Sequence, residues 1–198
     1  VRGARQGAWA IRQAFEHPDP EQTNRDILAD LAGGVSAIEL VVGARGAAIK
    51  SAADLDLALA DVILEAAPVS LDAGADGLSA AHLLRDKLKG VAAPGTAFNL
   101  DPFGARLRGE ALDAAACFAF GASAAAELPH TRALRADARL VHEAGGSEAQ
   151  EIAYALHVGI AYLRGLTGAG LNAEQAANTI AFALSVGPDV LIETAKLR

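Results

Sequence analysis

The feature that most constrains the fold is a regular alternation of two kinds of segment along the 198 residues. Short apolar runs rich in β-forming residues alternate about six times with longer stretches of helical spacing. Several short runs are almost continuously apolar, as expected of parallel strands covered on both faces. The alternation therefore predicts an α/β fold. The runs expected to form strands are 9–13, 36–42, 68–72, 97–101, 133–141 and 179–184.

Turn and capping residues mark the helices expected between these strands. The pattern predicts a helix over 21–31, after a His-Pro-Asp-Pro turn and before Gly33-Gly34. A second helix is predicted over 51–66. Ser51 is its expected N-cap, and Asp54 forms a weaker version of the capping box.

The clearest helix signal lies in the last third of the chain. Ser147 and Gln150 form a capping box, and Gly168-Ala169-Gly170 is the expected stop. A further helical pattern covers 188–198. The apolar stripe expected to face the core of the capped helix is Ile152, Leu156, Ile160 and Leu163.

The order of elements favours a (β/α)8 barrel of the TIM type. Serial βα units without a GxGxxG loop fit a barrel better than a dinucleotide-binding sheet. About six units are visible, and a complete barrel takes about 250 residues. No Pro/Ser-rich linker interrupts the chain, so 1–198 is predicted to be a single partial barrel domain. The chain begins with Val1 and lacks methionine, which favours a processed or partial chain.

Composition argues against several classes of protein. The 17 Lys and Arg residues against 24 Asp and Glu residues give a net charge of −7, which disfavours nucleic-acid and anionic membrane surfaces. The lone Cys117 excludes an intramolecular disulfide framework, and no CxxC or Cys/His cluster offers a metal site. No apolar run approaches the roughly 20 residues that span a bilayer, and the N-terminus lacks a signal-peptide core. A cytoplasmic protein is therefore expected.

Four residues are candidates for chemistry, because barrel enzymes carry their sites at the carboxyl ends of the strands. Asp72 and Asp101 end the third and fourth predicted strands, where they would bind ligand or cap loop amides. His142 and Glu143 follow the fifth strand and would form a general acid/base pair. The alternative, that both residues line a turn before Ser147, is favoured, because no nucleophile or metal partner is visible.

His142 also belongs to an incomplete cofactor motif. With Gly145 it forms His-x-x-Gly, half of the Asp-x-His-x-x-Gly pattern in which cobalamin-binding domains supply the cobalt ligand. The Asp position holds Leu140. We therefore expect no cobalamin-binding domain, no bound cofactor and no metal in this chain.

Several segments resemble the methylmalonyl-CoA mutase family, and the resemblance runs over nearly the whole chain. Near the start these are Trp-Ala-Ile-Arg-Gln at 9–13 and Leu-Ala-Gly-Gly-Val-Ser at 31–36. The strongest stretch begins at His142 with His-Glu-Ala-Gly-Gly-Ser-Glu-Ala-Gln-Glu-Ile-Ala-Tyr-Ala-Leu and closes with Ile-Glu-Thr-Ala-Lys-Leu-Arg at 192–198. The resemblance implies an adenosylcobalamin-dependent isomerase with a CoA-threading (β/α)8 barrel.

The catalytic residues of that family are not carried over. Catalytic members place a Tyr against the substrate thioester after the first-strand Arg-Gln, where this chain has Ala14. Their fifth strand reads Gly-Tyr-His, with the His bonding the thioester carbonyl, and these positions align with Ala138, Arg139 and Leu140. Losing one such donor costs roughly 10²–10³-fold in rate. The resemblance therefore points to the small, non-catalytic subunit of heterodimeric bacterial mutases.

That assignment implies a partner and leaves two alternatives. The small subunit pairs with a catalytic large subunit that binds adenosylcobalamin and interconverts methylmalonyl-CoA and succinyl-CoA in propionate metabolism. One alternative is the barrel portion of an active CoA mutase whose other domains lie elsewhere. The second is an unrelated TIM-barrel enzyme that uses the four candidates named above, which would then have to converge in one pocket.

Overall fold

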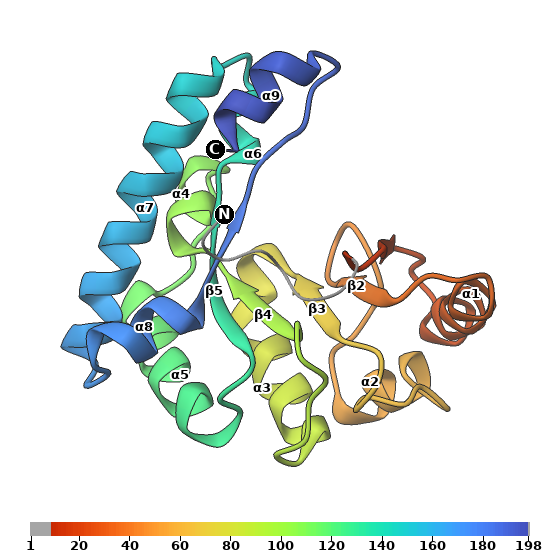
Figure 1. Cartoon of the computed structure of the whole chain (residues 1–198). Helices are drawn as coiled ribbons and strands as arrows, with labels where there is room; N and C mark the ends of the chain where they lie inside the picture. The colour runs from red at the N-terminus through yellow and green to blue at the C-terminus, as the bar shows by residue number, and fades with distance from the viewer. Residues whose placement is uncertain (1–8, 198) are drawn as a thin grey trace.

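The computed structural model describes residues 9–197 and has a six-stranded sheet at its centre (Figure 1). All neighbouring strands are parallel and follow one another in sequence order. The strands are β1 (Arg12–Phe15), β2 (Ala37–Val41), β3 (Val69–Asp72), β4 (Ala97–Leu100), β5 (Arg132–Asp137) and β6 (Ile180–Ala183).

The helices form an outer layer around the curved sheet, and the predicted α/β class is confirmed (Figure 1). Sequential parallel strands with covering helices are consistent with a TIM-type fold. The sheet is open, because no pairing joins β1 to β6 within the described part of the chain. The helices are α1 (Pro20–Ala32), α2 (Ala52–Ala58), the 3₁₀ turn η1 (Gly74–Asp76), α3 (Gly77–Leu88), α4 (Pro102–Leu107), α5 (Ala114–Glu127), α6 (Arg139–Glu143), α7 (Glu148–Gly168), α8 (Ala173–Thr179) and α9 (Val190–Lys196).

Both predicted capping boxes are present. The Ser51 hydroxyl accepts from the Asp54 amide at the start of α2, and Ser147 and Gln150 form the same reciprocal pair before α7. The predicted length of α2 is wrong, since the helix ends at Ala58 instead of running to residue 66. Soon after that end, Asp61 adopts a left-handed conformation with φ of 59°, which an α-helix cannot contain.

The predicted fifth strand is also too long, because β5 ends at Asp137. The Asp137 carboxylate accepts a hydrogen bond from the Arg139 amide at 3.2 Å and turns the chain into the short helix α6. Leu140, predicted to lie in the strand, is therefore on a helix, and His142 lies on the same helix. The first strand is shifted as well, since β1 covers Arg12–Phe15.

The predicted core-facing stripe of α7 is only partly right, since Ile152 and Leu163 are half-buried and Leu163 packs against the core. Leu156 and Ile160 are 57% and 50% exposed, while Tyr162 and Leu166 are completely buried. The buried side of α7 contacts α5, α8 and the last two strands. Apolar residues occupy two neighbouring stripes of this helix, and spacing alone does not distinguish them.

The hydrophobic core lies between the sheet and this helical layer. Leu40, Leu71, Phe98 and Leu134 supply one fully buried residue from each of the four central strands. Among residues 9–197, no helix is both long enough and apolar enough to span a membrane.

Candidate functional site

Charged side chains meet across the inside of the curved sheet, toward the carboxyl ends of the strands. Arg135 of β5 is their centre, and its side chain is only 9% exposed. One terminal nitrogen lies 3.0 Å from the Glu39 carboxylate of β2. The other lies 3.2 Å from Asp137 of β5 and 3.6 Å from Asp72 at the end of β3. Arg135 thus connects strands that are far apart in sequence.

Two further arginines extend this cluster. The guanidinium of Arg139 makes two bonds to Asp137, at 2.8 and 2.6 Å, and that of Arg45 lies 3.5 Å from Asp72. Together with Arg135 and Glu39, these residues form what we call the Arg135 network. Its three guanidinium groups and three carboxylates have no net charge, although the buried Nε of Arg135 has no hydrogen-bond partner among the described residues.

The surroundings of Asp137 hold its carboxylate in the ionised form. Burial by itself raises the pKa of Asp137, but the bonds from Arg139 and the positive charge of Arg135 outweigh it and lower that pKa. The same bonds to Asp137 raise the pKa of Arg139. The arrangement therefore suits permanent ion pairing better than proton transfer near neutral pH.

Asp101 lies in a separate environment. It is the N-cap of α4, where its Oδ1 accepts the Gly104 amide at 2.9 Å, and the Tyr162 hydroxyl of α7 donates to the same carboxylate. Burial raises the pKa of Asp101 although both bonds oppose the shift. Burial and the nearby Asp101 also raise the pKa of Tyr162. The bond to Gly104 is a capping contact, made to the first turn of helix α4 and not to a loop.

The less favoured alternative, an acid/base pair of His142 and Glu143, has no direct contact between the two side chains to support it among residues 9–197. His142 of α6 places its Nδ1 3.8 Å from Oε2 of Glu151, a completely buried carboxylate of α7. Glu143 is exposed on the same short helix. The residue that His142 faces is therefore Glu151, which the sequence did not indicate.

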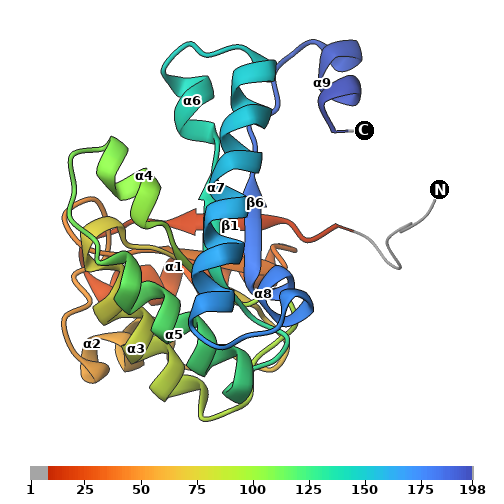
Figure 2. The ribbon, with the colours of Figure 1, turned by 90° about the vertical axis from the view of Figure 1, so that its left-hand side faces the viewer.

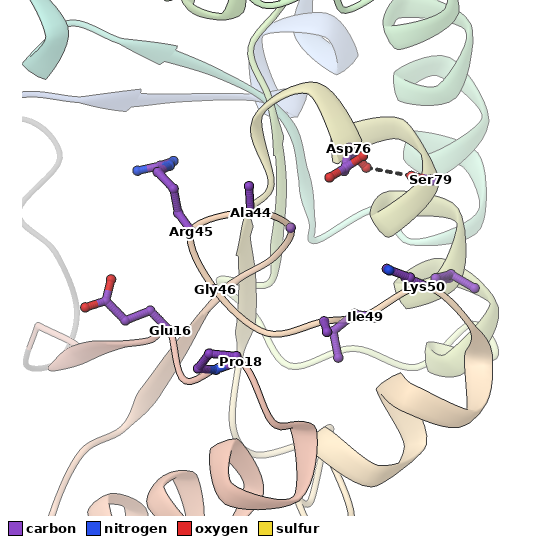
Figure 3. A pocket seen from close by; sticks show the side chains of 12 residues that line it. Glu16, Pro18, Ala44, Arg45, Gly46, Ile49, Lys50, Asp76 and Ser79 are labelled. Carbon is purple, nitrogen blue, oxygen red and sulfur yellow. Dashed lines mark hydrogen bonds between the residues drawn. The ribbon is translucent and has the colours of Figure 1, made fainter.

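The four candidate residues consequently lie in different surroundings. Asp72 belongs to the Arg135 network, Asp101 contacts Tyr162, and His142 contacts Glu151. A cavity of about 730 Å³ opens beside the loop that follows β2 (Figure 3), and none of the four lines it. Its charged lining residues are Glu16, Arg45, Lys50 and Asp76. The convergence that the unrelated-enzyme alternative requires is not present.

A second cavity, of about 600 Å³, lies next to α6. Its walls include Leu140, Val141, Arg108 and Gln150. Leu140 also approaches α4, where a Cβ atom added to Gly104 would lie 3.1 Å from its methyl group. In the wall of this cavity, the side chain of residue 140 is therefore an isobutyl group and not a hydrogen-bond donor.

The described residues do not fit the cobalt-binding role of a cobalamin domain. The imidazole of His142 is turned toward the buried carboxylate of Glu151. No group of three His, Cys, Asp or Glu side chains within residues 9–197 is arranged to hold a metal ion. We therefore derive no chemical step through cobalamin in this chain.

Comparison with known proteins identifies the family. The family profile described as methylmalonyl-CoA mutase matches residues 112–198, which include the stretch where the resemblance is strongest. A methylmalonyl-CoA mutase small subunit from Streptomyces virginiae is 37% identical over 97% of this chain. The chain belongs to the methylmalonyl-CoA mutase family.

Other members of the methylmalonyl-CoA mutase family give the same result. The small subunit from Propionibacterium freudenreichii subsp. shermanii is 32% identical over 100% of the chain. A probable small subunit from Mycobacterium bovis is 34% identical over 96% of it. The chain spans about a third of the length of these curated relatives, namely 32%, 31% and 31% in the order given.

Sequence reasoning did not identify Arg135 and its partners as the main feature of this region. A signal was present, because Arg135 and Asp137 are two residues apart in the same strand and so point to the same face of the sheet. Charged residues at such buried positions need partners. Glu39 is the equivalent single charge within the apolar run of β2.

Proposed function

We propose that this chain is part of the small, non-catalytic subunit of an adenosylcobalamin-dependent methylmalonyl-CoA mutase. In this proposal its role is to associate with a catalytic large subunit, which interconverts methylmalonyl-CoA and succinyl-CoA. Relatives that carry the name of the small subunit match almost the whole chain, which supports the assignment.

The observation that carries the non-catalytic role is the chemistry at the carboxyl ends of the strands. Ala14 and Leu140 stand where the resemblance requires a phenol and an imidazole, and neither side chain can bond a thioester carbonyl. The arginines of the Arg135 network are bonded to carboxylates of the same chain. Donors aimed at developing charge are the main source of rate enhancement in such sites, so their absence supports an inactive barrel.

We further propose that adenosylcobalamin is bound by the partner and not by this chain. The cofactor supplies the isomerisation chemistry wherever it is bound. In this chain, the orientation of His142 toward Glu151 supports a structural role for the histidine of the incomplete His-x-x-Gly motif.

Co-expression with a catalytic large subunit tests the association. We expect the two chains to elute as a single species in size exclusion and the large subunit to melt at a higher temperature, because binding stabilises the folded state of each partner. The large subunit alone and the large subunit with an unrelated barrel protein are the controls. Separate elution of the two chains at micromolar concentration would contradict the proposal.

Activity measurements test the non-catalytic role independently. The chain mixed with adenosylcobalamin and methylmalonyl-CoA is expected to give no turnover, and the Leu140→His variant is expected to give none either. One restored donor cannot replace an entire preorganised site. Measurable turnover by either protein would contradict the non-catalytic role and leave the association to be judged by elution alone.

A further inference from the structure

A cavity of about 730 Å³ opens at the carboxyl ends of β1, β2 and β3, between the segments that follow these strands (Figure 3). Parallel α/β folds bind their ligands at this end of the sheet, and the volume is in the range of small-molecule sites, about 300–1,000 Å³. In Figure 2 the tip of β1 and helix α9 lie on opposite sides of the molecule, so the cavity is remote from the last helix. Its lining comes from Glu16 and Pro18 after β1, residues 43–46 and 48–50 after β2, and Asp76, Ser79 and Leu83 at the start of α3.

The loop after β2, which forms most of the wall, is held in one conformation by backbone contacts. The Ala47 amide donates to the Val41 carbonyl at 2.8 Å. The Ala48 amide donates to the Pro18 carbonyl at 3.0 Å and so ties this loop to the segment after β1. Gly46 is required between them, because an added Cβ would collide with the Val41 carbonyl oxygen. The wall is therefore preorganised, which lowers the entropy that a ligand loses on binding.

The charged residues of the lining have no net charge. Glu16 and Asp76 contribute two negative charges, and Arg45 and Lys50 contribute two positive charges. Arg45 lies 3.5 Å from Asp72 of the Arg135 network. In Figure 3 the side chains of Glu16 and Arg45 lie on one side of the loop after β2, and those of Lys50 and Asp76 lie on the other. A lining without net charge favours a ligand that is neutral overall.

Lys50 and Asp76 line the same cavity without bonding to each other. Within residues 9–197, neither the Lys50 ammonium nor the Asp76 carboxylate takes part in a hydrogen bond or an ion pair. The carboxylate of Asp54 is already bonded to the amides of Lys50 and Ser51, at 3.0 and 2.9 Å. The ammonium of Lys50 and the carboxylate of Asp76 are therefore available to a ligand that carries both opposite charges.

An apolar surface lies beside these two charges. Ile49 is 8% exposed and belongs to the hydrophobic core, and Leu83 of α3 is half-buried and packs against that core. Both residues line the cavity. An aliphatic group that lies on them loses contact with water, which favours binding by about 25 cal/mol for each Å² of apolar surface buried.

We propose that the cavity is a binding site for a small zwitterion with an aliphatic group, the chemistry of an apolar α-amino acid. The ligand carboxylate contacts the Lys50 ammonium, the ligand ammonium contacts the Asp76 carboxylate, and the aliphatic group lies on Ile49 and Leu83. A ligand with one charge pairs with one of the two groups and leaves the other unpaired, so the site selects for both charges. The site takes no part in the proposed subunit role and is tested without a partner subunit.

Titration of the full chain with L-leucine, followed by NMR chemical shifts, tests the site. We expect saturable shifts in the segments that line the cavity, with a dissociation constant of about 1 mM or tighter. Isocaproate lacks the ammonium of L-leucine, and isoamylamine lacks its carboxylate. Each is expected to bind roughly tenfold more weakly, because it leaves one charge of the site unpaired.

Two variants assign the contacts, and a third is the matched control. Lys50→Met is expected to weaken L-leucine roughly tenfold and to leave isoamylamine unchanged, and Asp76→Ala to weaken L-leucine equally and to leave isocaproate unchanged. Lys89→Met changes an exposed lysine outside the cavity and is expected to leave all three affinities unchanged. The proposal is overturned by shifts that do not saturate at millimolar L-leucine, by equal affinities for the three compounds, or by equal effects of Lys50→Met and Lys89→Met.

Discussion

Replacing Arg135 with Met directly tests the importance of the Arg135 network. The substitution keeps an unbranched side chain of similar length and removes the guanidinium that lies among Glu39, Asp72 and Asp137. The three carboxylates are not affected equally. Asp137 keeps its two bonds from Arg139, and Asp72 keeps Arg45 and is 24% exposed. Glu39 loses the one side chain bonded to it among residues 9–197.

The expected loss of stability is set mainly by Glu39, because the other two carboxylates keep a partner. Removing one partner of a fully buried ion pair costs about 3–5 kcal/mol. Glu39 is 17% exposed, so water partly replaces its lost partner and we expect about 2–3 kcal/mol for Arg135→Met. For a chain of this size that change lowers the melting temperature by about 4–12 °C.

Urea unfolding of the wild type, Arg135→Met, Glu39→Gln and the double variant measures both the cost and the coupling energy. We expect the two substitutions to be non-additive by about 1–2 kcal/mol, because they remove the same contact. Arg106→Met, on the exposed side of α4, is the matched control and should change stability by less than about 0.5 kcal/mol. A loss of unfolding free energy below about 0.5 kcal/mol for Arg135→Met would refute the reasoning. Losses in the two single variants that add up to the loss in the double variant would refute it as well.

Three further predictions concern the core, acid stability and the single thiol. Leu166→Ala should destabilise the protein by about 2–5 kcal/mol and Leu156→Ala by less than about 1 kcal/mol, because Leu166 is buried and Leu156 is exposed. Equal losses in urea unfolding would mean that the helix faces the other way. The pKa of Asp137 is lowered in the folded protein, so its contribution to stability is present above the ordinary value of about 3.9 and is lost as pH falls through the lowered value. Asp137→Asn should therefore flatten the decrease of unfolding free energy in acid, and an unchanged slope would count against the ion pairing with Arg139. Burial raises the pKa of Cys117 to about 12, so a thiol reagent should modify it only after unfolding, and rapid modification of the native protein would show that the site is open.

Local signals in the sequence were sufficient to determine the order of the elements. The capping boxes at Ser51 and Ser147 formed as expected, because each depends on residues only three positions apart. The short apolar runs became parallel strands because only a doubly covered sheet buries them on both faces. The ends of elements were less predictable. Where α2 and β5 stop depends on the left-handed conformation of Asp61 and on the bonds between Asp137 and Arg139.

The sequence by itself gives Ala14 and Leu140 at the two positions where the resemblance places catalytic groups. Only the tertiary structure decided which charged side chains meet. Arg135 and Glu39 are 96 positions apart, and no local pattern pairs them; their contact exists because β2 and β5 curve around the same interior. His142 likewise meets Glu151 because α6 and α7 fold back on each other, and Lys196 joins them from α9. Charges buried by folding must find partners wherever the chain places them, so their pairing is a property of the packed structure.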